Sequence, residues 1–555
     1  MTDTAAAQLD AIRSGYSFAG AALQFGAAMS AGAAGADPVP HPDVPVNLPL
    51  SVMNRHGLVA GATGTGKTKT LQLMAEQLSA NGVPVFLADI KGDLSGLAQA
   101  GEGNEKLLAR TQGIGQEWAG QAFPCEFFSL GGMGQGVPIR ATITAFGPLL
   151  LSKVLGLNAT QESSLGLVFH YADKRGLPLL DLKDLRAVVQ HLTSDEGKAD
   201  LKELGGLSSS TAGVILRKLI AFSDQGAEAF FGEPELDTAQ LLRTAPDGRG
   251  MISILELPAV QDRPALFSTF LMWLLAELFQ DLPEVGDIDK PKLVFFFDEA
   301  HLLFKDASKE FIGQIEQTVR LIRSKGVGVF FVTQTPRDVP SGVLAQLGNR
   351  VQHALRAFTP EDAKALSATV KTFPKSGYDL EELLTQLGTG EAVITVLSER
   401  GAPTPVAWTR MRAPLSLMAP AADATVAGIV ATSPLNAQYA TAVDRESAYE
   451  MLTAKLAPEP TPQGAPAPVP PYGDVQDSLP GETYRAPIPP LQDRPAPPPP
   501  APAPAPAPKA EPEGPSMVEQ VISSPMFKSM MRSAGTVIGR EITRSVFGTA
   551  KRRRR

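Results

Sequence analysis

Apolar and amphipathic stretches alternate in two parts of the chain, residues 46–100 and residues 291–415. In the first part, the apolar runs HGLVA and VPVFLADI flank a glycine-rich loop and KTLQLMAEQLSA, which has helical spacing. In the second part, KLVFFFD and GVGVFFVTQ are apolar almost throughout, as parallel strands are when both faces are buried. The helix expected between them places its apolar residues on one face, namely Phe311, Ile315, Val319 and Ile322. This alternation predicts an α/β fold with a mostly parallel, doubly wound sheet.

The remaining segments differ from these two parts in pattern and composition. Residues 101–290 are mostly helical in pattern, with one strand-like run, GMISILEL, and they predict a largely helical insertion into the sheet domain. Residues 1–45 form a Gly/Ala-rich segment, in which residues 14–36 are expected to be strand or loop and ADPVPHPDVPV a Pro-punctuated loop. Residues 416–457 predict a C-terminal helical extension. Residues 458–515 are rich in Pro and Ala and predict a disordered linker. Residues 516–555 predict a short amphipathic helix that ends in the basic tail KRRRR.

Composition narrows the class of protein. The formal net charge of −8 argues against nucleic-acid binding over the whole surface, so any such contact must be local. The one cysteine, Cys125, excludes a disulfide framework and a cysteine-based metal site. Residues 14–36 carry no charge, but they are mostly Ala and Gly, and no other segment approaches the roughly 20 apolar residues of a spanning helix. We therefore expect a cytoplasmic protein.

The stretch GATGTGKT matches the phosphate-binding pattern G-x-x-x-x-G-K-[ST] at every required position. An apolar strand precedes it and an amphipathic helix follows it, as this motif requires, whereas a chance glycine-rich turn would need neither. Lys67 is expected to reach the β and γ phosphates, and Thr68 to place its hydroxyl on Mg²⁺. The residues predicted to bind the nucleotide are Gly61, Ala62, Thr63, Gly64, Thr65, Gly66, Lys67, Thr68 and Lys69.

Acidic and polar residues at the ends of other apolar strands predict the rest of the site. Asp298 directly follows LVFFF and is expected to hold Mg²⁺, and Glu299 to orient and deprotonate the attacking water. Gln334 closes the strand VFFVTQ, where it either senses the γ-phosphate or is an ordinary strand-end residue. The loop Asp89–Asp93, DIKGD, either lines the site, contacts a neighbouring subunit or forms a solvated turn.

The letters DEAH at residues 298–301 also name a class of RNA helicases, but the chain does not fit that class. Lys67 and Asp298 are 231 positions apart, much farther than the corresponding motifs of DEAH-box enzymes. We also expect too few folded residues after Arg400 for a second ATPase domain. A motor with one ATPase domain usually works as a ring in which a neighbour supplies an arginine to the γ-phosphate. The candidates for that arginine are Arg323 first, Arg320 second and Arg350 third. For each of them, the alternative is a surface residue that forms a salt bridge.

Several of these stretches together resemble the bacterial HerA-like helicase/translocase ATPases of the FtsK–HerA superfamily. LGTGEAVITVL, at Leu387–Leu397, also fits that family, and the resemblance covers about residues 45–415. The stretches that carry it are Asn54–Thr68, Ala88–Leu97, Lys290–Phe304, Val319–Pro336 and Gln346–Pro360.

The resemblance implies a RecA-like P-loop NTPase core, ATP and Mg²⁺ as cofactors, a homohexameric ring and ATP-driven movement on double-stranded DNA. It implies nucleotide and metal contacts at Lys67 and Thr68, and metal and water contacts at Asp298 and Glu299. It also implies a sensor at Gln334. The helix that carries Arg320 and Arg323 matches the region where the superfamily places its trans-acting arginine.

One departure from the family limits what can be carried over. HerA begins with a β-barrel domain, whereas the roughly sixty residues before the phosphate loop here do not look like a barrel, which argues against pairing with a NurA-type nuclease. No residue pattern by itself identifies DNA as the substrate. The alternative is a VirB4-like ATPase that acts on a protein or a membrane-associated partner. The basic tail, Lys551–Arg555, either contacts DNA phosphates or anionic lipid or is a solvated end.

Overall fold

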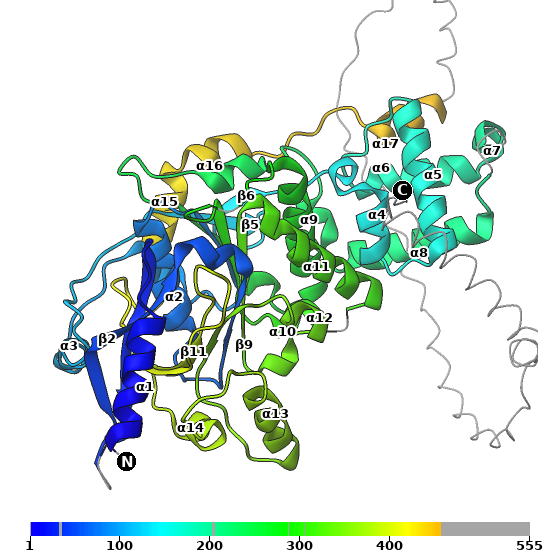
Figure 1. Ribbon diagram of the computed structural model, residues 1–555. Coiled ribbons are helices and arrows are strands. Elements are labelled where there is room, and N and C mark those ends of the chain that lie inside the picture. Colours follow the sequence, from blue (N-terminus) through cyan, green and yellow to red (C-terminus); the bar gives the residue numbers. More distant parts are fainter. Residues whose placement is uncertain (1, 33–35, 202–205, 287, 306, 457–555) are drawn as a thin grey trace, which may run out of the picture. The chain divides into compact units, whose positions relative to one another are not determined.

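The computed structural model describes residues 2–32, 36–201, 206–286, 288–305 and 307–456 (Figure 1). The predicted Pro-rich linker and the predicted helix with the basic tail lie outside these residues. Within them, one sheet of 12 strands has the order β2-β1-β12-β11-β10-β3-β9-β8-β4-β7-β5-β6.

The larger part of this sheet is parallel. From β10 to β6, each strand pairs in parallel with its neighbour, whereas β11, β12, β1 and β2 continue the sheet by antiparallel pairing. The predicted α/β fold with a mostly parallel sheet is therefore confirmed. In sheet order, the parallel strands are β10 (Asn349–Gln352), β3 (Gly57–Ala60), β9 (Val327–Thr333), β8 (Leu293–Phe297), β4 (Val85–Asp89), β7 (Ile252–Glu256), β5 (Cys125–Leu130) and β6 (Val137–Ile139). The antiparallel strands are β11 (Glu391–Thr395), β12 (Ala407–Met411), β1 (Ala22–Ser30) and β2 (Val39–Pro49).

Helices cover both faces of the parallel strands, which explains why these strands are apolar almost throughout. In β8, Val294 and Phe296 belong to the core that includes α2 (Lys67–Ala80). Phe295 belongs to the opposite core, which includes α9 (Pro264–Asp281) and α11 (Lys309–Ile322). The apolar face predicted for α11 is confirmed, because all four of its residues are buried, namely Phe311, Ile315, Val319 and Ile322.

The N-terminal segment is part of the same sheet. After α1 (Thr2–Gly15), β1 pairs with β12, and β2 pairs with β1 as the last strand at that end. The loop predicted for ADPVPHPDVPV is wrong, because Val39–Pro49 form β2, whose four prolines favoured a loop in the sequence. An edge strand tolerates proline, since its N–H groups need no partner on the outer side. In β1, a Cβ atom at Gly26 would lie 2.0 Å from the Arg410 carbonyl oxygen, so only glycine lets the two backbones approach this closely.

The helical insertion is narrower than residues 101–290. After α3 (Glu105–Gln112), that range also supplies β5, β6, β7 and α9 to the sheet and its cover. The strand predicted in GMISILEL is β7, whereas β5 and β6 were not predicted. Apolar strands of three to six residues are hard to distinguish from helical segments by periodicity. The helices outside the sheet's own cover are α4 (Ile143–Val154), α5 (Ala159–Lys174), α6 (Leu182–Thr193), α7 (Asp195–Leu201) and α8 (Ser209–Asp224).

The C-terminal helices return to earlier parts of the chain. After β10 come α13 (Pro360–Val370) and α14 (Leu380–Gln386), and after β12 come α15 (Asp423–Thr432), α16 (Pro434–Tyr439) and α17 (Ala448–Leu456). Figure 1 shows α17 beside α6, and the Asp184 carboxylate of α6 accepts the Tyr449 backbone N–H at 2.9 Å. The short helices α10 (His301–Phe304) and α12 (Ser341–Leu344) lie in connections. Of the helices in the described ranges, none is both long and apolar enough to cross a membrane.

His56 ties the start of β3 to its neighbour β9. The imidazole is buried, and its Nδ1 accepts the Val329 backbone N–H at 3.0 Å. Burial, with a smaller contribution from the charge of Arg323, lowers the pKa of His56 to about 4. Protonation of Nδ1 would replace this hydrogen bond by two opposed N–H groups, so the fold requires a neutral ring.

We predict that His56→Gln weakens the loss of stability on acidification. In the wild type, the unfolded chain takes up a proton on this residue below pH 6.5, while the folded chain does so only near pH 4. Between these values the free energy of unfolding therefore falls as the pH falls, by up to about 1.4 kcal/mol per pH unit for this residue. The variant retains an acceptor but cannot titrate.

Denaturant unfolding between pH 7 and pH 5 measures this slope. His170→Gln is the matched control because His170 is exposed on α5, and it should leave the wild-type slope unchanged. Equal slopes in His56→Gln and in the wild type would contradict the prediction.

Candidate functional site at the carboxyl edge of the sheet

Neighbouring parallel strands bring the predicted motifs to one edge of the sheet. The strands β3, β9, β8, β4 and β7 are adjacent in this order and run in the same direction. Their carboxyl ends therefore lie side by side, which is where ligands bind in such sheets. In the same order, these ends carry residues 61–68, Gln334, the pair Asp298 and Glu299, the loop 89–93, and Glu256.

Hydrogen bonds to two other strand ends hold the phosphate loop. The Gly61 N–H donates to the Thr333 carbonyl at 3.2 Å, and the Ala62 N–H donates to the Ala354 carbonyl at 2.8 Å. The Lys67 ammonium folds back onto the Ala62 carbonyl at 3.1 Å. Helix α2 begins at Lys67 after Gly66, which has a φ of 115° and offers no side-chain cap. The uncapped N–H groups of this first turn form an anion-binding site.

Residues His353 and Gly390 support the phosphate loop and the first turn of α2. The imidazole of His353 is buried between Thr70, whose hydroxyl lies 2.9 Å from Nε2, and the Glu391 carbonyl, which lies 2.8 Å from Nδ1. Because a carbonyl only accepts, Nδ1 carries the proton, and Nε2 accepts from the Thr70 hydroxyl. Burial lowers the pKa of His353 to about 4, which keeps this arrangement neutral. The Gly390 N–H donates to the Thr65 carbonyl at 2.9 Å and fixes the loop from its other side.

Asp298 and Glu299 follow β8 and are both buried, at 3% and 5% exposure. Glu299 has a φ of 46°, a left-handed conformation that is uncommon for a non-glycine residue and that turns its side chain away from the strand direction. Its carboxylate forms an ion pair with Lys91, and its Oε2 lies 3.2 Å from His301 Nδ1. Burial acts to raise the pKa of Glu299, but the hydrogen bond and charge of Lys91 outweigh burial and hold the pKa below its ordinary value.

Several carboxyl groups share this edge. Burial raises the pKa of Asp298 to about 7, and the charge of Glu299 adds to this shift. Burial also raises the pKa of Glu256 to about 8, with the charges of Asp89 and Asp93 adding to it. One carboxylate oxygen from each of Asp89, Asp93 and Asp298 lies within 4.8 Å of the others. A divalent cation would offset the cost of burying these like charges.

Asp89 and Lys91 show that the loop 89–93 is part of the site. The Asp89 carboxylate accepts the N–H groups of Gly92 and Leu94, each at 2.8 Å, so this residue shapes the turn. Lys91 extends from that turn to Glu299. Of the alternatives left open for this loop, the structure favours the one in which it lines the site. The sequence also missed Glu256, although a carboxylate that ends the apolar strand ISILE repeats the pattern of LVFFFD.

Gln334 and Lys69 lie at the site without a close contact to the lysine and carboxylates at its centre. Gln334 is exposed directly after β9, between the ends of β3 and β8. Lys69 Nζ donates to Gln72 Oε1 at 3.2 Å on α2. Burial lowers the pKa of Lys69, while Asp93 and Asp89 act in the opposite direction, so its ammonium faces the 89–93 loop. Thr68 is half-buried in the first turn of α2.

The candidate arginines lie at the opposite edge of the sheet. Arg320 is in the last turn of α11, and Arg323 begins the short helix η7 (Arg323–Lys325), directly before β9. The phosphate loop lies beyond the other end of this seven-residue strand, roughly 23 Å away at about 3.3 Å per residue. Arg350, in β10, donates to the Thr372 hydroxyl. In their own chain, Arg320 and Arg323 therefore cannot reach the bound phosphates.

Several known proteins are similar to this chain. A helicase of Methanocaldococcus jannaschii, described as probable, is 31% identical over 153 residues, which cover 26% of this chain and 28% of that protein. The DNA double-strand break repair helicase HerA of Sulfurisphaera tokodaii is 23% identical over 363 residues, which cover 63% of this chain and 64% of that protein. The chain thus spans less than two thirds of either relative. The plasmid coupling protein TrwB in complex with ADP and Mg²⁺ has a TM-score of 0.47 at 17% identity, with 72% of this chain and 98% of that chain covered.

The family described as "Helicase HerA-like C-terminal" matches residues 37–555, most of the chain. The phosphate loop, the two acidic residues after β8 and the parallel sheet between them are those of a P-loop ATPase. The chain therefore belongs to the HerA-like C-terminal helicase family, within the HerA–FtsK superfamily of P-loop ATPases.

Proposed function

We propose that this chain hydrolyses ATP to drive a homohexameric ring along double-stranded DNA. Family membership supports the ATP-driven motor. The observation that carries the proposal is the convergence of Lys67, Asp298 and Glu299 on one sheet edge. Burial lowers the pKa of Lys67, and the carboxylates of Glu299 and Asp298 act against this shift, as expected for a lysine that lies between them and an incoming phosphate.

The nucleotide phosphates would lie on the loop of residues 61–68, with Lys67 at the β and γ phosphates. Thr68 and Asp298 would hold Mg²⁺, which neutralises phosphate charge when it is bound. The residues present fit this ion, because Asp298 Oδ2 is buried with no hydrogen-bond partner among the described residues, and an Asp298 oxygen lies within 4.8 Å of oxygens of Asp89 and Asp93. The remaining residues from Gly61 to Lys69 would complete the cradle through backbone N–H groups.

Glu299 would act as the base that orients and deprotonates the attacking water. The ion pair with Lys91 keeps this carboxylate ionised, which is the form a general base needs. Gln334 would contact the γ-phosphate or that water, since it lies between the strand ends that carry Lys67 and Glu299.

A neighbouring chain would complete the site. Because Arg323 and Arg320 are at the opposite edge of their own sheet, a contact with phosphate requires another subunit, as a ring provides. Arg323 is the first candidate and Arg320 the second, because both lie on the segment that leads into β9.

Double-stranded DNA is the proposed substrate because a HerA relative is named for DNA double-strand break repair. The alternative is a VirB4-like ATPase that acts on a protein or membrane-associated partner. We do not propose a NurA-type nuclease as a partner, because the N-terminal strands β1 and β2 extend the ATPase sheet. A contact between the basic tail and DNA or anionic lipid stays a prediction, since the tail lies outside the described residues.

The first prediction concerns the substrate. Lys67→Ala and Glu299→Gln should each abolish ATP hydrolysis, by at least about a hundredfold, because they remove the phosphate contact and the base. The wild-type rate should rise when double-stranded DNA is added. Steady-state ATPase assays with and without duplex DNA measure both effects. A rate that these variants abolish but that duplex DNA does not change would keep the site and favour the VirB4-like alternative.

The second prediction concerns the phosphate loop. A Cβ atom at Gly61 would lie 2.5 Å from His353 Cβ and 2.9 Å from the Thr65 hydroxyl. Gly61→Ala should therefore displace the loop, weaken nucleotide binding by about tenfold or more and destabilise the fold by about 1–3 kcal/mol. Titration calorimetry with ADP and denaturant unfolding check these values. Gly166→Ala is the matched control, because a Cβ atom there meets nothing within 4 Å and should leave ADP binding unchanged.

The third prediction tests whether Arg323 acts between subunits. Arg323→Ala alone should lower the ATPase rate by about a thousandfold. Mixed with Glu299→Gln chains, it should regain activity, because some interfaces then pair an intact Glu299 with an intact Arg323 from the neighbour. The rate of the mixture is compared with that of each variant alone, and Arg320→Ala is taken through the same series. An absence of recovery for both arginines would exclude them as trans-acting groups.

A further inference from the structure

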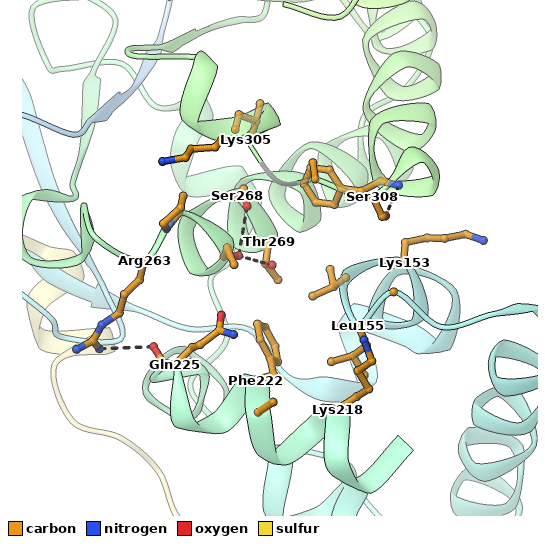
Figure 2. Close-up of a pocket in the computed structure, with 18 of the residues that line it drawn as sticks. Lys153, Leu155, Lys218, Phe222, Gln225, Arg263, Ser268, Thr269, Lys305 and Ser308 are labelled. Carbon is orange, nitrogen blue, oxygen red and sulfur yellow. Dashed lines mark hydrogen bonds between the residues drawn. The ribbon is translucent and has the colours of Figure 1, made fainter. Parts of the chain in front are cut away.

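A cavity of about 560 Å³ lies between the helical insertion and the cover of the sheet, and the phosphate loop does not line it. Figure 2 shows its walls, which come from the ends of α4 and α8 on one side and from the start of α9 and the α10–α11 segment on the other. Its volume is within the range of about 300–1,000 Å³ found for small-molecule sites.

Positive charge dominates the lining of this cavity. Of the described residues that line it, four are cationic and one, Asp262, is acidic; the cations are Lys153, Lys218, Arg263 and Lys305. Lys153 pairs with Glu162 at 2.7 Å, and Arg263 lies 3.9 Å from Asp262. The described residues give Lys218 and Lys305 no ion-pair partner. Among the described residues, the lining therefore carries more positive than negative charge.

The cations come from separate elements and surround one space. Lys218 is on α8, and its Nζ lies 4.0 Å from the position a Cβ atom at Gly156 would take, just after α4. Lys305 follows α10, and Arg263 directly precedes α9. Since the four side chains in Figure 2 belong to four segments far apart in the sequence, only the folded insertion brings them together.

A helix end adds to the attraction for anions. Helix α9 has 18 residues and begins at Pro264 after Arg263, with no side-chain cap on its first N–H groups. Its positive end contributes to the same cavity wall through Pro264 and Ala265. Between the charged groups, the wall is apolar and partly aromatic, with Leu155, Phe222 and Phe311. Such a site can hold phosphate groups at one end and a flat or apolar body at the other.

We propose that this cavity is a second ligand site, separate from the phosphate loop, for a nucleotide-sized phosphate ester. The phosphates would contact Lys218 and Lys305, with Arg263 and the start of α9 beside them. The organic body would pack on Phe222 and Leu155. A duplex is too wide for a cavity of this size, so the free ester fits better than the backbone of bound DNA. This site does not depend on the proposed motor activity.

The test uses full-length Lys67→Ala protein, in which the phosphate loop no longer binds nucleotide tightly. Titration calorimetry with ADP, and separately with pyrophosphate, should still show one binding event per chain. Adding Lys218→Gln and Lys305→Gln should weaken that event by at least about tenfold, because two charge-assisted contacts are lost. The control pair Lys364→Gln and Lys371→Gln makes the same charge change on exposed residues at α13 and should have no effect.

Three results would overturn the proposal. The first is the absence of ADP and pyrophosphate binding to Lys67→Ala protein that circular dichroism shows to be folded. The second is binding that Lys218→Gln and Lys305→Gln leave unchanged. The third is that Lys218→Gln and Lys305→Gln abolish the binding of a 5′-phosphorylated single-stranded oligonucleotide but not the binding of ADP. That result would assign the cations to a nucleic-acid strand. None of these outcomes alters the ATPase result with duplex DNA, so failure of this site and failure of the motor proposal are distinguishable.

Discussion

Parallel pairing of β3, β9, β8 and β4 is the constraint on which the candidate site depends. Because parallel strands all end at the same edge, the loop after each strand comes within reach of the others, however far apart they are in the sequence. Lys67 and Glu299 lie 232 positions apart, yet the charge of Glu299 acts on the pKa of Lys67. If β8 were one strand farther from β3, Glu299 would lie farther from the phosphate loop, whereas Gln334, directly after β9, would stay beside it.

Charge balance at this edge follows from burial. Asp298, Glu299 and Asp89 are almost completely buried, and like carboxylates in such surroundings strongly oppose each other's ionisation. Two kinds of contact stabilise the ionised carboxylates. Lys91 keeps Glu299 ionised, and the turn of residues 89–94 satisfies Asp89 through backbone N–H groups. Within the part of the chain that the structure describes, Asp298 Oδ2 receives no such partner, so it is the atom that a cation would bind.

The elements added to the parallel strands do different work. Strands β1 and β2 extend the sheet at the end beyond β12, where prolines are tolerated. The helical insertion, α4 to α8, comes between β6 and β7 in the sequence. The ends of α4 and α8 line a cationic cavity together with residues of α9 and residues that follow α10. The wall of that cavity includes Leu303 and Lys305, within six residues of Glu299. The insertion and the segment that follows Glu299 thus line the same cavity.

The sequence by itself determined the parallel core and the chemistry of its edge. Apolar runs such as LVFFF indicated buried strands, and GATGTGKT together with Asp298 and Glu299 predicted a phosphate and water site, because both signals are local in the chain. Tertiary structure alone decided what depends on distant neighbours. The Lys91–Glu299 ion pair and the contact of His353 with Thr70 join residues from separate elements, and Glu256 reaches the same edge at the end of β7. The proline-containing β2 is a strand only because the sheet offers it an edge, and the cationic cavity exists only because four separate segments meet.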